Sequence, residues 1–124
     1  MEQVGKLSTD IINLLNLNIA PNTPILIGDS NIDHIKARHP YEYDMYYDRI
    51  PEILETPDFV GINPNNNSIQ FVKFFYVVNE YIRVAVKIST NKMCFVKSMH
   101  LLSTFNAERY IQKGTLKKLD NTSL

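Results

Sequence analysis

Histidines, isolated cations and a hydroxyl are the side chains of this 124-residue sequence whose types could together cleave a phosphodiester. Cleavage of RNA without a metal ion needs a base that takes the proton of the 2′-hydroxyl and an acid that protonates the leaving 5′-oxygen. It also needs cations that stabilise the charged phosphorane. Histidine suits both proton-transfer roles because its unperturbed pKa is about 6.5. Lysine and arginine suit the third role, and a serine hydroxyl can bind a phosphate oxygen.

Two of the three histidines, His34 and His39, lie in the segment GDSNIDHIKARHPYEYDMYYDRIPEILETP, residues 28–57. The pattern predicts a helix here that ends before Pro40, because the residue preceding a proline is pushed out of α geometry. His34 and Arg38 are four residues apart and would share one face of this helix. The sequence does not determine which of the two histidines acts.

The clearest strand pattern covers residues 81–88, where apolar side chains alternate with Tyr, Arg, Ala and Lys. One face of this strand would be core, and the other would display Arg83 and Lys87. Lys73 lies on the preceding predicted strand and Ser98 on the following one. These strands could bring several cations and a hydroxyl to one sheet.

The candidate catalytic residues are therefore His34, His39, Lys73, Lys87 and Ser98. The candidate contacts to RNA or phosphate are Arg38, Arg83 and Lys97. His100 follows the last predicted strand and is left out. Each candidate also has a structural interpretation: a histidine on a short helix can cap it or lie on the surface, and the outer face of an antiparallel sheet is normally polar.

A metal site is not expected, because His34 and His39 are five residues apart and miss the i, i+4 spacing that places two ligands on one helix face. The four glycines are scattered, so no phosphate-binding loop and no cofactor are expected. The one cysteine, Cys94, lies in an apolar run and is expected to be a buried thiol. No apolar run reaches the length of a membrane span, and a cytoplasmic location is expected.

The formal net charge is zero, which argues against a general high-affinity nucleic-acid binder. The charges are divided unevenly along the chain. Residues 1–80 hold five Lys/Arg and eleven Asp/Glu, a charge of −6, whereas residues 81–124 hold eight Lys/Arg and two Asp/Glu, a charge of +6. The second half could offer phosphates a cationic surface, or it could pack against the acidic half.

The periodicities predict an α+β fold with N-terminal helices, an antiparallel four-stranded meander and a C-terminal helix. The first helix is predicted over residues 4–17, or over a shorter stretch capped by Ser8 or Thr9. Further helices are predicted from Ser30 to Arg38, over 41–56 with a break near Pro51, and over 104–112, ended by Gly114. Strands are predicted at ILIG, FVGI, SIQFVKFFYVV, YIRVAVKIST and KMCFVKSM.

Three sequence features carry a family resemblance: IDHIKARHP, then IPEILETPDFV, then a meander with Lys73, Lys87 and a late VKS. Over about residues 25–116 the chain resembles the phage-associated nuclease-like families of the barnase–EndoU–colicin–RelE fold. The resemblance implies a metal-independent ribonuclease of a phage or mobile element, with a toxin or host-takeover role. It places His34 or His39, together with Lys73, Lys87 and Ser98, at site-like positions.

The chain is thus expected to be a single domain over residues 1–124, with an N-terminal helix in 1–20, a nuclease-like core in 25–116 and a frayed tail in 117–124. The alternative is a binding module of the same fold that has lost catalysis and contacts a host protein or RNA. The expected partners are RNA, a host protein or a cognate inhibitor, without a membrane; the first helix could instead form a homodimer.

Overall fold

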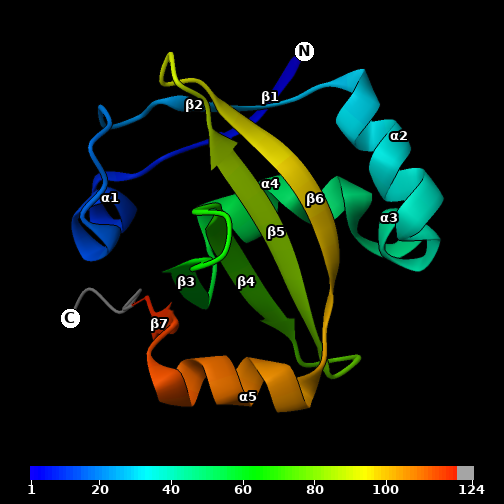
Figure 1. Ribbon diagram of the computed structural model, residues 1–124. Coiled ribbons are helices and arrows are strands. Elements are labelled where there is room, and N and C mark those ends of the chain that lie inside the picture. The colour runs from blue at the N-terminus through cyan, green and yellow to red at the C-terminus, as the bar shows by residue number, and fades with distance from the viewer. Residues whose placement is uncertain (120–124) are drawn as a thin grey trace.

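A computed structural model of the chain describes residues 1–119 and shows an α+β fold built on one seven-stranded sheet (Figure 1). In chain order the elements are β1 (Glu2–Lys6), α1 (Thr9–Leu15), β2 (Pro24–Ile27), α2 (Asp29–Arg38), α3 (Pro40–Tyr46), a 3₁₀ turn η1 (Tyr47–Arg49), α4 (Ile50–Glu55), β3 (Phe59–Ile62), β4 (Ile69–Phe75), β5 (Glu80–Ile88), β6 (Cys94–Leu102), α5 (Thr104–Lys113) and β7 (Leu116–Lys118). No helix in this part of the chain is long and apolar enough to cross a membrane.

The strand order is β1-β2-β6-β5-β4-β3-β7. Strands β3 to β6 form the antiparallel meander that the alternating pattern predicts. The α+β class is confirmed, but the strand count and order differ from the prediction. β2 joins the sheet parallel to β6. In the chain, helices α2 to α4 connect β2 to β3, the first strand of the meander.

The N-terminal helix is shorter than predicted because the first residues form a strand. β1 pairs antiparallel with β2, so its backbone groups are satisfied in the sheet. The Ser8 hydroxyl accepts a hydrogen bond from the Ile11 amide and caps α1, which therefore begins at Thr9. The longer helix from residue 4 was therefore wrong at its start, and the shorter alternative capped by Ser8 is confirmed.

The predicted frayed tail is also partly wrong, because β7 pairs antiparallel with β3. The chain before β7 approaches β3 closely at Gly61, where an added Cβ would lie 2.0 Å from the Thr115 carbonyl oxygen. A side chain at this position would therefore displace β7. The rest of the predicted tail, residues 120–124, lies outside the described residues.

The helical segment that carries two of the histidines follows its prediction closely. α2 ends at Arg38, and α3 begins at once with Pro40 in its first turn. His39 is therefore both the last cap of α2 and the first cap of α3. The break predicted near Pro51 occurs slightly earlier, in the 3₁₀ turn η1.

The sheet is packed on both faces, and this decides which side chains remain accessible. The main core lies between one face and α1 to α4, and it includes Ile82, Val84 and Cys94. On the other face α5 packs against Val72 and Leu102. The Ser103 hydroxyl accepts a hydrogen bond from the Asn106 amide and caps helix α5.

Candidate active site

The centre of the candidate site is a cross-strand pair on the sheet face that also receives α5. Arg83 on β5 is the register partner of His100 on β6. A β-bulge brings them together: the register shifts by one between Ala85 and Val86, which gives β6 one extra residue at Lys97. Without this bulge Arg83 would face Met99, and His100 would point into the main core.

Arg83 is held by hydrogen bonds to two side chains. Its Nε and Nη2 lie 3.0 Å and 2.5 Å from Nε2 of His100, and its Nη1 donates to Oε1 of Gln70 on β4 at 2.8 Å. Burial lowers the pKa of the Arg83 guanidinium, and the nearby Tyr110 hydroxyl of α5 opposes that shift. The guanidinium is thus fixed in place beside His100 and Gln70. Its planar set of N–H groups remains a source of hydrogen-bond donors.

His100 is held as a neutral imidazole. Burial, followed by the positive charge of Arg83, lowers the pKa of His100 from 6.5 to about 4. Because Nε2 accepts from Arg83, the ring proton of the neutral form is assigned to Nδ1. At neutral pH both ring nitrogens are therefore engaged, and the ring can accept a proton on Nε2 only when Arg83 releases that nitrogen.

His39 lies directly beside His100, although the two are far apart in the sequence. Their rings stack with centroids 5.4 Å apart and an interplanar angle of 27°. Oε2 of Glu42 is 3.6 Å from Nδ1 of His39 and also accepts a hydrogen bond from the Leu101 amide at 2.9 Å. Glu42 thereby fastens the α2–α3 junction to the end of β6 and offers His39 a carboxylate partner.

The other predicted residues on helix α2 lie at the margin of this cluster. The His34 ring is exposed and sits edge-on to His39, with centroids 6.3 Å apart. Arg38 is exposed in the last turn of the helix. His39 therefore lies between His34 and His100, and His34 is on the solvent side of the cluster.

The predicted strand residues divide between the two sheet faces. Ser98 is two residues before His100 and shares its face. Lys87 also shares the face of Arg83, but four residues along a strand separate them by about 13 Å. Lys97 is the exposed extra residue of the bulge. Ser98 is thus the nearest of these three to the histidine pair.

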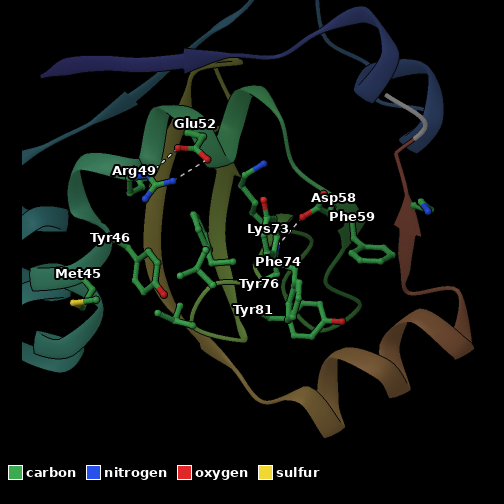
Figure 2. Close-up of a pocket in the computed structure, with 14 residues that line it drawn as sticks. Met45, Tyr46, Arg49, Glu52, Asp58, Phe59, Lys73, Phe74, Tyr76 and Tyr81 are labelled. Carbon is green, nitrogen blue, oxygen red and sulfur yellow. Dashed lines mark hydrogen bonds and ion pairs between the residues drawn. The ribbon is translucent and has the colours of Figure 1, made fainter. Parts of the chain in front are cut away.

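Lys73 is not brought to the cluster. Its register partner is Ile82, which belongs to the main core, so Lys73 lies on the opposite face of the sheet from Arg83. Its Nζ donates to the carbonyl oxygen and the hydroxyl of Thr56 at 2.7 Å and 3.2 Å. Lys73 lines a groove of about 830 Å³. Figure 2 shows it there together with Tyr46, Arg49 and Glu52.

His100 and Gln70 are the site residues that the sequence interpretation missed. The predicted strand stopped at Met99, although no turn residue appears before Ser103, and β6 in fact extends to Leu102. A signal for the bulge was present: the buried residues Val96 and Met99 are three apart, which breaks a period of two. Reading that break would have placed Ser98 and His100 together on the face of Arg83.

Comparison with known proteins gives one match. The chain matches the family described as phage-Barnase-EndoU-ColicinE5/D-RelE like nuclease3 over residues 2–119. Searches of curated proteins and of solved structures gave no match. The family match covers nearly the whole chain, including every element of the site. The chain therefore belongs to the phage-Barnase-EndoU-ColicinE5/D-RelE like nuclease3 family.

Proposed function

We propose that this phage-type nuclease domain cleaves RNA by metal-independent transesterification at the cluster of His39, His100 and Arg83. The observation that carries the proposal is the stack of His39 on His100, with the Arg83 guanidinium hydrogen-bonded to the second ring. Two adjacent histidines and a fixed cation meet the three requirements of the reaction. The pairing of two titratable groups with different environments also supports an assignment of acid and base.

In this proposal His100 is the base and His39 the acid. Arg83 turns its N–H donors from Nε2 of His100 to the phosphate, and the freed Nε2 takes the proton of the 2′-hydroxyl as the 2′-oxygen attacks the phosphorus. His39, whose imidazolium form pairs with Glu42, gives a proton to the 5′-oxygen as the bond between phosphorus and that oxygen breaks. The products are a 2′,3′-cyclic phosphate and a free 5′-hydroxyl. The accepted and donated protons balance within one step.

Arg83 has two tasks in the same scheme. Its guanidinium stabilises the charge of the phosphorane, with a planar set of donors that suits phosphate oxygens. It also lowers the pKa of His100. When a phosphate compensates the charge of Arg83, this lowering weakens, so His100 becomes a stronger base as substrate binds. Ser98, on the same face, would add a hydrogen bond to a phosphate oxygen.

A toxin or host-takeover role is a further part of the proposal. Cleavage of cellular RNA by an unregulated domain would stop growth, and the family is phage-associated. Expression of the wild type in bacteria should arrest growth, whereas expression of His100→Gln to the same level should not. Equal growth with both chains at equal soluble levels would argue against this role.

The reaction itself is tested with a short RNA and the same RNA carrying a 2′-deoxy sugar at the cleaved position, both in excess EDTA. The proposal predicts that the RNA is cut, that the deoxy substrate stays intact, and that the 3′ product ends in a cyclic phosphate. Cutting of the deoxy substrate would contradict the use of the 2′-hydroxyl. Intact RNA throughout would favour the alternative, a binding module of the same fold.

A further inference from the structure

Two apolar side chains lie on the same sheet face as the histidine cluster, at the end of the sheet away from α5. They are Phe95 on β6 and Leu26 on β2, which are register partners. Cys94 and Val96, on either side of Phe95, point into the main core. Phe95 therefore points to the opposite face, which is the face of Arg83. We call Phe95 and Leu26 the apolar platform.

The apolar platform belongs to neither core of the protein. Phe95 and Leu26 are half-buried, and neither is part of the main core or of the smaller cluster under α5. Within residues 1–119 no other aromatic ring contacts the Phe95 ring. Figure 1 shows α5 beside the ends of β5 and β6 near the β4–β5 turn, whereas Phe95 is near the start of β6, at the β5–β6 turn. The face of this ring is therefore available to a ligand.

A row of short side chains connects the apolar platform to the histidine cluster. This row contains the register partners Ala85 and Ser98, and it lies between the two regions on the same face. Lys87, the register partner of Phe95, is about 13 Å from Arg83 along β5. A nucleic-acid strand rises about 3.4 Å per nucleotide in a duplex and more when it is extended. The spacing therefore corresponds to about two to four nucleotides of one strand.

The charges on this part of the sheet suit the backbone of RNA. Lys87 is exposed, and within residues 1–119 it makes no ion pair and no side-chain hydrogen bond. Lys97, the extra residue of the bulge, is also exposed. No carboxylate stands in the two rows of register partners that cross this area: Gln3, Leu26, Phe95 and Lys87, then Gly61, Gln70, Ala85 and Ser98. The area thus offers phosphates cations that no acidic side chain in these rows compensates.

We propose that the apolar platform is a subsite for single-stranded RNA, in which one base of the substrate stacks on the Phe95 ring while Lys87 contacts an adjoining phosphate. An aromatic side chain next to a cation is the combination that binds single strands, because every base has a face that can stack. A duplex would keep that face covered by neighbouring bases, so the base must be unpaired. The inference rests on the proposed function for the identity of its ligand, but its claim concerns binding and not cleavage.

The subsite is tested with a short oligoadenylate whose sugars all carry 2′-O-methyl groups, so that the protein binds it without cleaving it. A second probe has the same backbone without bases. Phe95→Leu, which keeps an apolar side chain, should raise the Kd of the oligoadenylate at least about fivefold, the effect of losing one stacked base. The Kd of the abasic strand should stay the same. Phe105→Leu is the matched control, because it alters an exposed phenylalanine of α5 and should leave both Kd values unchanged.

The phosphate contact is tested separately through the dependence of binding on salt. Lys87→Ala should weaken binding of both strands and should reduce the slope of log Kd against log salt concentration by about 0.7, the contribution of one phosphate on a single strand. Lys113→Ala, which removes an exposed lysine in the last turn of α5, should leave this slope unchanged. A slope that is the same in Lys87→Ala and the wild type would overturn the phosphate contact.

The outcomes separate this subsite from the proposed reaction. Weaker oligoadenylate binding by Phe95→Leu, in a protein that cleaves no ordinary RNA, would support the subsite and contradict the proposed function. A folded Phe95→Leu protein that cleaves RNA and binds the oligoadenylate as tightly as the wild type would overturn the subsite alone. A wild type that binds no oligoadenylate would overturn it as well. Self-association that Phe95→Leu abolishes would also overturn it, because a second copy of the chain would then cover the platform.

Discussion

Arg83 on β5 donates to Nε2 of its register partner His100 on β6, at 3.0 Å from Nε. This contact joins a cation that suits phosphate to a neutral imidazole that suits proton transfer. It also makes the two groups dependent on each other, because the charge of Arg83 helps to keep His100 neutral. The first four predictions below concern this pair, its neighbours and the sheet that carries them.

Replacing Arg83 by Gln should raise the pKa of His100 above its value of about 4. The rise should stop short of 6.5, because burial is the larger cause of the lowering and remains in the variant. Titration of the His100 ring proton by NMR measures this directly, and exposed His34 in the same spectrum serves as an internal control. An unchanged His100 titration in a folded variant would refute the coupling.

The stability of the domain should depend on pH through His100. The folded state keeps this ring neutral down to about pH 4, whereas the unfolded chain protonates it near 6.5. Between these values the unfolded state binds more protons, so the free energy of unfolding rises with pH across this window. Allowing for partial exposure, the gain is about 2 kcal/mol. Urea unfolding at several pH values should show that the free energy of unfolding depends less on pH in His100→Gln than in the wild type. An identical pH dependence in both proteins would count against His100 as its source.

The rate of RNA cleavage should fall when a residue of the histidine cluster is replaced and should change little when a residue outside it is replaced. His39→Ala and His100→Ala should each lower kcat by about 10² to 10⁴, the usual contribution of a proton-transfer group. Lys73→Ala should remain within about tenfold of the wild type, because Lys73 lies on the opposite sheet face and bonds to Thr56. Initial rates on one RNA substrate measure all three. Loss of cleavage in Lys73→Ala with a wild-type melting temperature would favour the site expected from the sequence.

The pairing of β7 with β3 should not tolerate a side chain at Gly61. A Cβ there would lie 2.0 Å from the Thr115 carbonyl oxygen, so Gly61→Ala should cost about 2 kcal/mol or more. Gly28→Ala is the matched control, because its nearest neighbour would be at an ordinary contact distance of 3.5 Å. Chemical denaturation of both variants gives the comparison. Equal stability of the two would mean that β7 does not pack as described.

Local patterns predicted much of this fold. The alternation along residues 81–88 predicted β5 and its faces, and Pro40 with the preceding helix pattern predicted where α2 ends. The strands β1 and β7 escaped prediction because their residues have little pattern of their own. Their structure depends on backbone pairing with distant strands, which short sequence windows do not contain.

The candidate site was harder to predict than the fold, for a reason that is visible at Lys97. One extra residue in β6 exchanges the two faces of the strand beyond it, and so it decides whether His100 or Met99 meets Arg83. The stack of His39 on His100 joins residues that are sixty-one positions apart, since a turn of backbone between α2 and α3 happens to reach the end of β6. His39, Arg83 and Ser98 could be named in advance, but their arrangement around His100 could not.

The measurement that tests the central claim most directly is cleavage of RNA in excess EDTA by wild type and by His100→Gln, with the product ends identified. We predict that the wild type leaves 2′,3′-cyclic phosphate ends, and that the variant, folded by circular dichroism, loses at least about a hundredfold in rate. A folded His100→Gln protein that cleaves as fast as the wild type would contradict the assignment of this cluster as the active site.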